Sequence, residues 1–301
     1  MACSKARNVI LDTDIGTDID DAWALCMLLK CPELNLRMVS TTTGDAKKRA
    51  QIAAKILDRN GRTDVPIAVG LYSRVTPMNV GEQSWAEDYD LDSYPGGVFT
   101  DGIGALIDML DKTEKPTLIC IGPLCNIQQL CLRRPDLCAK TEFIAMAGAI
   151  YKGYGGKEST ETAEWNIRHH IAEAQTVFMT KWKSMAITPL DTCGIVRLKG
   201  ERYERLKRSD SPLVRTILEN YRHWLGKPES DEETESSVLF DTVAIYLACT
   251  HENLRMQTLK IEIDDGGRML LDTSDGNPVN VAIDWMDLDA YEEYLVNRLM
   301  L

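Results

Sequence analysis

Five aspartates fall within ten consecutive residues near the start of the chain. The surrounding stretch, residues 9–29, reads VILDTDIGTDIDDAWALCMLL, and its carboxylates belong to Asp12, Asp14, Asp18, Asp20 and Asp21. Residues 9–11 have the apolar composition of a buried strand, and residues 22–29 are apolar and favour a helix. The acidic side chains therefore lie at or beyond the carboxyl end of a strand, where open α/β sheets bind their ligands.

Charges of one sign this close together repel, so the cluster needs solvent, protonation or a cation to neutralise it. Carboxylate oxygens are hard ligands that suit Ca²⁺ or Mg²⁺. A simpler interpretation places Asp20 and Asp21 in the first turn of a helix, where the helix dipole favours acids. That interpretation does not account for Asp12 and Asp14 at the strand end.

The composition favours one domain that acts on a small molecule. The chain has 301 residues, of which 44% are hydrophobic, and no Pro/Gly/Ser-rich linker divides it, so we expect a single domain over residues 1–301. The formal net charge is −12 and no dense Lys/Arg face is present, which argues against nucleic-acid and anionic-membrane partners.

The cysteines and the start of the chain indicate an intracellular protein. Nine cysteines lie mostly in apolar segments without CxxC spacing, which is typical of reduced thiols in a core and makes zinc unexpected. The start, MACSKARN, has no apolar signal-peptide core, and no segment approaches the length of a membrane span. We therefore expect a cytoplasmic location.

Strands and helices alternate along the chain, which predicts a mostly parallel, doubly covered (Rossmann-like) α/β sheet. The predicted strands are residues 36–43, 65–69, 117–121, 142–147 and 185–188, followed by an antiparallel edge at 259–263, 268–272 and 279–283. The predicted helices are residues 46–60, 102–110, 201–208, 212–225, 243–249 and 288–299, with others ending at 133 and beginning near 171. Residues 70–100 show no period, so we expect a long surface loop that serves either as a lid or as structure.

Polar residues follow several of these predicted strands. Asp45 comes after residues 36–43, and the segment GPLCN (122–126) comes after residues 117–121. A glycine-rich stretch at 151–161 leads to Glu164-Trp165-Asn166, which could contact a ligand or cap the next helix. Asp241 stands at the predicted start of the helix at 243–249.

Four segments, DTDIGTDIDDAWAL, GPLCN, AEWN and FDTVAIYLA, together resemble the inosine/uridine-type nucleoside hydrolase family, in order along nearly the whole chain. The resemblance implies one domain with the nucleoside hydrolase fold and one Ca²⁺ at the strand ends. It also implies hydrolysis of the N-glycosidic bond of ribonucleosides, which releases free base and ribose for salvage. Because members of the family are usually oligomeric, we expect a homo-oligomer, either a dimer or a tetramer.

The resemblance assigns roles to individual residues. Asp14 resembles the family's catalytic base and metal ligand, and Asp21 and Asp241 resemble further metal ligands. Cys125 stands where Thr is usual and would supply only its backbone carbonyl to the metal. Three residues match positions that hold the ribose hydroxyls: Asp20, Glu164 and Asn166.

The chain departs from the family pattern around the sugar. The first segment carries two extra residues, so Asp18 and Asp20 both remain candidates to face the ribose, and we favour Asp20. Asp45 and Glu158 stand where Asn is common, and we include both as ribose-contacting candidates.

A further departure concerns the leaving group. Phe240 replaces the His that often protonates the departing base, and an aromatic residue there resembles the subgroup that stacks on purines. We expect Phe240 to provide one stacking face and Trp85 or Trp224 the other, although each Trp could equally pack in the core. His223 is a fallback acid, and a slight purine preference follows.

Two other functions are consistent with parts of the sequence. Asp12-Thr13-Asp14 resembles the start of a haloacid-dehalogenase-type phosphatase, but Gly16 stands where that motif needs Thr or Val. A non-catalytic nucleoside or sugar sensor would keep the metal ligands without turnover, and Phe240, Asp45 and Glu158 motivate that alternative.

Overall fold

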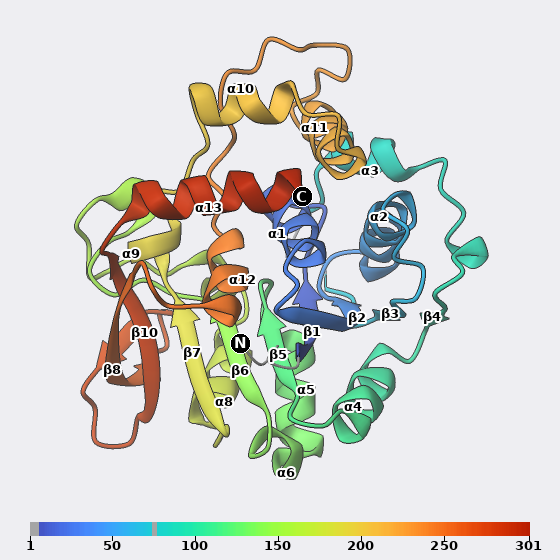
Figure 1. The fold of residues 1–301 in the computed structure, drawn as a ribbon. Helices are drawn as coiled ribbons and strands as arrows, with labels where there is room; N and C mark the ends of the chain where they lie inside the picture. Colours follow the sequence, from blue (N-terminus) through green and yellow to red (C-terminus); the bar gives the residue numbers. More distant parts are fainter. Residues whose placement is uncertain (1–5, 74–76) are drawn as a thin grey trace.

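A ten-stranded sheet runs through the part of the chain that the computed structural model describes, residues 6–73 and 77–301 (Figure 1). Its strand order is β4-β3-β2-β1-β5-β6-β7-β10-β8-β9. The first eight strands in this order, from β4 at the edge to β10, pair in parallel. The strands β8 and β9 complete one edge in antiparallel pairing. The bounds are β1 (Arg7–Thr13), β2 (Leu34–Thr41), β3 (Ile67–Val69), β4 (Val98–Phe99), β5 (Thr117–Cys120), β6 (Glu142–Met146), β7 (Ser184–Thr188), β8 (Leu254–Ile263), β9 (Met269–Leu271) and β10 (Asn277–Trp285).

Helices cover both faces of the sheet, with one apolar core on each side. Side chains of α1, α2, α11, α12 and α13 pack in one core, and side chains of α4, α5, α6 and α8 pack in the other. The bounds are α1 (Asp20–Leu29), α2 (Ala46–Arg59), α3 (Val80–Ala86), α4 (Gly102–Lys112), α5 (Cys125–Arg133), α6 (Pro135–Cys138), α7 (Trp165–Arg168), α8 (Ile171–Met179), α9 (Leu190–Cys193), α10 (Glu201–Lys207), α11 (Pro212–Trp224), α12 (Thr242–Cys249) and α13 (Leu288–Met300). The predicted single α/β domain with a doubly covered, mostly parallel sheet is confirmed.

The segment at 70–100 differs from the predicted structureless loop. It contains the helix α3, the 3₁₀ turn η1 (Leu91–Ser93) and the edge strand β4, while residues 74–76 lie outside the described part. These elements are too short for the spacing of their hydrophobic residues to show a helical or strand period. Trp85 of α3 is 2% exposed, and its Nε1 donates to Glu219 Oε1 at 2.9 Å. It therefore packs α3 against α11.

The cysteines within the described residues are free, and all of them except the half-buried Cys249 are buried. None of the helices in the described ranges is long and apolar enough to cross a membrane.

Loops at the carboxyl ends of the parallel strands form one edge of the sheet. Asp14 directly follows β1, and Gly122 and Gly148 stand just beyond β5 and β6. Gly16 has φ +103°, and a Cβ there would lie 2.8 Å from side-chain atoms of Ile52 and Met78. Glycine at this position lets the loop after β1 turn tightly against α2.

Candidate active site

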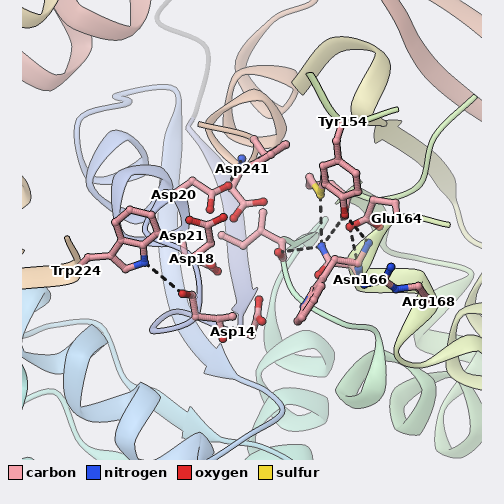
Figure 2. A pocket seen from close by; sticks show the side chains of 15 residues that line it. Asp14, Asp18, Asp20, Asp21, Tyr154, Glu164, Asn166, Arg168, Trp224 and Asp241 are labelled. Atoms are coloured by element: carbon pink, nitrogen blue, oxygen red, sulfur yellow. Dashed lines mark hydrogen bonds between the residues drawn. The ribbon is translucent and has the colours of Figure 1, made fainter. Parts of the chain in front are cut away.

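A cavity of about 450 Å³ opens at this edge of the sheet (Figure 2). Carboxylates crowd one part of it and aromatic rings line another. The lining residues are Asp14, Thr17, Asp18, Asp20, Asp21, Ile121, Met146, Tyr154, Glu164, Trp165, Asn166, Arg168, Trp224, Phe240 and Asp241. Segments far apart in the sequence thus meet at one place, as ligand sites in open α/β sheets do.

Three buried aspartates bring their oxygens together in the cavity. Carboxylate oxygens of Asp20, Asp21 and Asp241 lie within 4.8 Å of one another, and each residue is 3% exposed. The backbone N–H of Asp241 donates to Asp20 Oδ2 at 3.0 Å, and Thr13 Oγ1 donates to Asp21 Oδ1. Burial, and then repulsion from neighbouring carboxylates, raise the pKa of all three carboxyls well above the usual value, and for Asp20 the repelling neighbour is Asp18. A divalent cation with oxygen ligands would relieve that repulsion.

Asp14 lines the cavity from the end of β1 and is 4% exposed. Burial raises its pKa to about 6, while the nearby Arg49 guanidinium opposes that rise. A Cβ on Gly122 would stand 2.7 Å from the Asp14 backbone nitrogen and 2.9 Å from its Oδ1. Only glycine at the start of GPLCN leaves room for the Asp14 carboxylate.

Asp12 has a different role from its neighbours. It is fully buried outside the cavity lining, and its Oδ1 accepts a hydrogen bond from Asn126 Nδ2 at 2.8 Å. The same Nδ2 donates to the Thr41 carbonyl at 3.0 Å. Asp12 and Asn126 therefore tie the ends of β1 and β2 to α5.

Arg49 holds the loop that carries Asp14 and was not among the predicted site residues. The side chain is fully buried, and its Nη1 donates to the backbone carbonyls of Asp14 and of Ile15, the latter at 3.0 Å. Its Nε donates to the Thr43 carbonyl at 2.9 Å. A single Arg in an amphipathic helix gives no sequence signal for such a role.

Glu164 and Asn166 line the cavity and also anchor the segment that carries them. Glu164 is the N-cap of α7: its Oε1 accepts from the Asn166 N–H at 2.7 Å and its Oε2 from the Gly148 N–H at 3.0 Å. Asn166 Nδ2 donates to the carbonyls of Ile121 and Met146 at 3.2 and 3.1 Å. Burial raises the pKa of Glu164 to about 7. The capping and cavity-lining interpretations therefore both hold.

Aromatic rings flank the carboxylates. Figure 2 shows Trp224 on one side of the aspartates and Tyr154 on the other. Trp224 Nε1 donates to the Thr17 carbonyl at 3.2 Å, and the rings of Tyr154 and Phe240 meet edge to face with centroids 6.1 Å apart. The Tyr154 hydroxyl accepts from the Trp165 N–H at 3.0 Å. Tyr154, in the 3₁₀ turn η2 (Tyr154–Gly156), was missed, and its only sequence signal is a Tyr in a glycine-rich stretch.

Residues 9–293 match the family model described as inosine-uridine preferring nucleoside hydrolase. The chain belongs to this family. It is therefore a nucleoside hydrolase, which makes it an N-glycosidase by class, and the phosphatase alternative has no support.

Similar proteins fit this assignment. The pyrimidine-specific ribonucleoside hydrolase RihA of Shewanella sp. (strain MR-7) is 29% identical over 71% of this chain and 68% of its own length. The non-specific ribonucleoside hydrolase RihC of Salmonella newport (strain SL254) is 25% identical, with 97% of each chain covered. Among solved structures, the plant nucleoside hydrolase PpNRh1 superposes with a TM-score of 0.79 at 20% identity, covering 98% of this chain and 99% of its own. The purine-preferring ribonucleoside hydrolase from Gardnerella vaginalis gives 0.78 at 18% identity, covering 98% of each chain.

Several predicted site residues of this nucleoside hydrolase do not line the cavity. Trp85 packs between helices, as described above. Asp45 caps α2 by accepting from the Lys48 N–H at 3.2 Å, and Glu158 is exposed in an isolated bridge with Lys152. His223 precedes Trp224 on α11, and because successive helical residues point about 100° apart, Trp224 faces the cavity and His223 does not.

The predicted metal ligands are only partly gathered in one cluster. Asp21 and Asp241 lie together as expected, but the third close carboxylate is Asp20, which was assigned to the ribose, while Asp14 lines the cavity beside them. Cys125 begins α5 outside the cavity lining, with its thiol near His170 and Glu173. Asp18 also lines the cavity, so both candidates for the ribose contact are present.

We predict that Arg49→Lys lowers kcat by roughly tenfold or more, because a misplacement on the order of 1 Å in a catalytic group is costly. Lysine keeps the charge but lacks the planar fork that reaches several carbonyls at once. Arg49→Met should in addition destabilise the fold by about 3–5 kcal/mol, since it removes a buried charge with its hydrogen bonds. Steady-state kinetics and urea unfolding measure the two effects. A wild-type kcat in Arg49→Lys would contradict this role.

A second prediction concerns Glu82 of α3, which is fully buried beside Arg49 and has a pKa that burial raises to about 8. Because its folded-state pKa exceeds the usual 4.5, its contribution to stability is complete at low pH and is lost as pH rises through 8. Glu82→Gln does not titrate, so the variant should gain roughly 1–3 kcal/mol relative to wild type between pH 5 and pH 8. Urea unfolding at both pH values, with Ca²⁺ present, measures this. An unchanged difference would refute it.

Proposed function

We propose that the chain is a Ca²⁺-dependent hydrolase of the N-glycosidic bond of ribonucleosides, with a slight preference for purines. The observation that carries the proposal is the cluster of Asp20, Asp21 and Asp241 beside Asp14, inside a cavity with aromatic walls. Family membership supports the reaction class. The relatives named above include pyrimidine-specific, non-specific and purine-preferring enzymes, so the preference for a base rests on the cavity walls.

The donor set fits Ca²⁺. The three clustered carboxylates offer only hard oxygen atoms, and no nearby cation among the described residues makes an ion pair with them. Ca²⁺ accepts several carboxylates in a flexible arrangement, which suits a crowded set of this kind. When bound, the ion would lower the pKa of a water molecule and position it for attack. The proposed protein ligands remain Asp14, Asp21, Asp241 and the backbone carbonyl of Cys125, with Asp20 beside them.

Asp14 is the proposed general base. It lies beside the cluster, and a pKa near 6 lets its carboxylate accept a proton from water at neutral pH. Cleavage of the glycosidic bond develops positive charge on the sugar. Asp20 and Glu164, which line the cavity, are proposed to stabilise that charge and, together with Asn166, to hold ribose hydroxyls.

The aromatic walls are the proposed aid to the leaving group. Among the described residues, no histidine lines the cavity, so a general acid of that type is not at hand. Phe240, Trp224 and Tyr154 offer ring faces or edges to a base. Stacking of a purine against them would raise the basicity of its ring nitrogen, so that solvent can protonate it as the bond breaks.

Two further expectations remain proposals. We propose a homo-oligomeric assembly, which the usual state of the family supports, and a cytoplasmic location, which the reduced cysteines support. Sedimentation measurements on the purified protein and fractionation of the source cells test them separately.

We predict that chelation abolishes release of free base and that added Ca²⁺ restores it. In Asp14→Asn, kcat should fall by roughly 10²–10⁴, the usual contribution of a general base, while the variant still folds. Chromatography of free base from a panel of nucleosides gives the rates, and metal analysis shows whether the variant retains its ion. Asp45→Asn is the matched control, because Asp45 caps α2 outside the cavity lining.

Activity that is indifferent to exhaustive chelation would overturn the metal dependence. Thermal stabilisation by nucleosides with no release of base would instead favour the non-catalytic sensor.

We predict that Phe240→Ala loses roughly a hundredfold in kcat on inosine but far less on p-nitrophenyl riboside, whose leaving group needs no protonation. Phe240→Leu, which keeps the apolar contact and removes the aromatic face, should resemble the Ala variant on inosine. Uridine should be the poorer natural substrate of the wild type. Equal losses on inosine and on p-nitrophenyl riboside would rule out activation by stacking.

A further inference from the structure

A second group of metal-ligating side chains lies outside the cavity, between α5 and α8. The Cys125 thiol, one ring nitrogen of His170 and a carboxylate oxygen of Glu173 all lie within 4.8 Å of one another. Cys125 is the first residue of α5, and His170 is the N-cap of α8, one turn before Glu173. The two helices pack against each other, so the cluster is held by secondary structure on both sides.

The hydrogen bonding of this cluster is incomplete. His170 is 8% exposed, and its buried Nε2 has no hydrogen-bond partner among the described residues. Its Nδ1 stands 3.6 Å from Glu173 Oε1. A buried imidazole nitrogen without a partner costs free energy unless something binds it. A metal ion satisfies an imidazole nitrogen directly, and both Nδ1, which faces Glu173, and the unpartnered Nε2 are available as its ligand.

The donor set has a chemical preference of its own. Thiolate, imidazole and carboxylate together form the ligand combination of Zn²⁺ and related divalent ions, not of Ca²⁺. Cys125 is 6% exposed, whereas the Glu173 side chain is 29% exposed, so an ion and a water ligand can reach the cluster from the Glu173 side. Burial, and then the negative charges of Glu173, Asp12 and Asp14, raise the pKa of the Cys125 thiol, and the same negative charges favour a cation.

We propose that Cys125, His170 and Glu173 form a second metal site, which binds Zn²⁺ or a similar thiophilic divalent ion. The ion replaces the thiol proton, which passes to solvent, and bonds to sulfur, nitrogen and oxygen, while a water molecule fills the fourth position. The proposal differs from the sequence expectation, which considered zinc only through CxxC spacing. Binding of this ion does not depend on the proposed function, whereas a link from this site to the cavity rests on the proposed Ca²⁺ site.

Cys125 would then link two sites. Its thiol faces the second cluster, while its backbone carbonyl is the proposed ligand of Ca²⁺. An ion bound at the thiol restrains the start of α5, which Asn126 ties to the end of β1. Metal binding at the second site would therefore restrain the backbone carbonyl that is proposed to bind Ca²⁺ at the first.

Titration with Co²⁺ tests the proposal, because a thiolate bound to Co²⁺ gives a charge-transfer absorption that oxygen ligands alone do not give. The full chain is first saturated with Ca²⁺, so that the Asp20, Asp21 and Asp241 cluster is filled. We expect the absorption to saturate at one equivalent of Co²⁺ and to disappear when Zn²⁺ is added. Cys125→Ser should abolish it, and His170→Gln should weaken binding by roughly tenfold or more.

Cys131→Ser is the matched control. Cys131 is also buried on α5, but its thiol lies 3.9 Å from the Cys138 thiol, outside the cluster. The control variant should keep the absorption. The proposal is wrong if the wild type gives no such band, if the band survives in Cys125→Ser, or if Cys131→Ser removes it. Because His170→Gln leaves the thiol intact, it decides the question even if Cys125→Ser fails to fold.

Discussion

Repulsion among buried carboxylates is the constraint on which the rest of the site depends. Asp14, Asp20, Asp21 and Asp241 are each at most 4% exposed, so water does little to screen their charges. The guanidinium of Arg49 acts behind them and opposes the rise in pKa of Asp14 and Asp21. One buried cation does not neutralise four carboxylates. The folded chain therefore retains uncompensated negative charge in the cavity, and a divalent ion can neutralise it.

The sheet makes such crowding possible. Parallel strands with helical crossovers bring their carboxyl ends to one edge, so Asp14 after β1, Gly122 after β5 and Asp241 before α12 meet although they are distant in the sequence. Hydrogen bonds then fix each loop: Arg49 holds the Asp14 loop, and Asn126 holds the end of β1. Rigid neighbours prevent the carboxylates from relaxing apart.

The sequence predicted the structure well where the signal is a local pattern, either a regular alternation of strands and helices or a short segment typical of the family. Alternating strands and helices predicted the parallel sheet, and the four segments predicted the carboxylates, Asn166 and Phe240, whereas Trp224 was one of two Trp candidates outside those segments. It was uninformative where a residue acts through its tertiary position. Arg49 looks like any helical arginine, and Trp85 and Trp224 differ only in which surface their helices present. His223 was misplaced because a residue adjacent to a cavity-lining residue on a helix points elsewhere.

The carboxylates of Asp14, Asp20, Asp21 and Asp241 form the floor of the cavity, and the rings of Trp224, Tyr154 and Phe240 form its walls. The floor and the walls come from different parts of the fold. The floor stands on β1, α1 and the start of α12, and its carboxylates depend on one another electrostatically, so a change there disturbs the whole set. The walls come from the end of α11, the turn η2 and the residue before Asp241, and the rings of Trp224 and Phe240 are only partly buried where they pack against the core. In the proposed function the walls contact the base, so a change in them would alter how well a given base departs, while the carboxylates would still act on the water and the sugar. Under this proposal the base preference of this chain depends on the rings of Phe240, Trp224 and Tyr154 and not on the carboxylates.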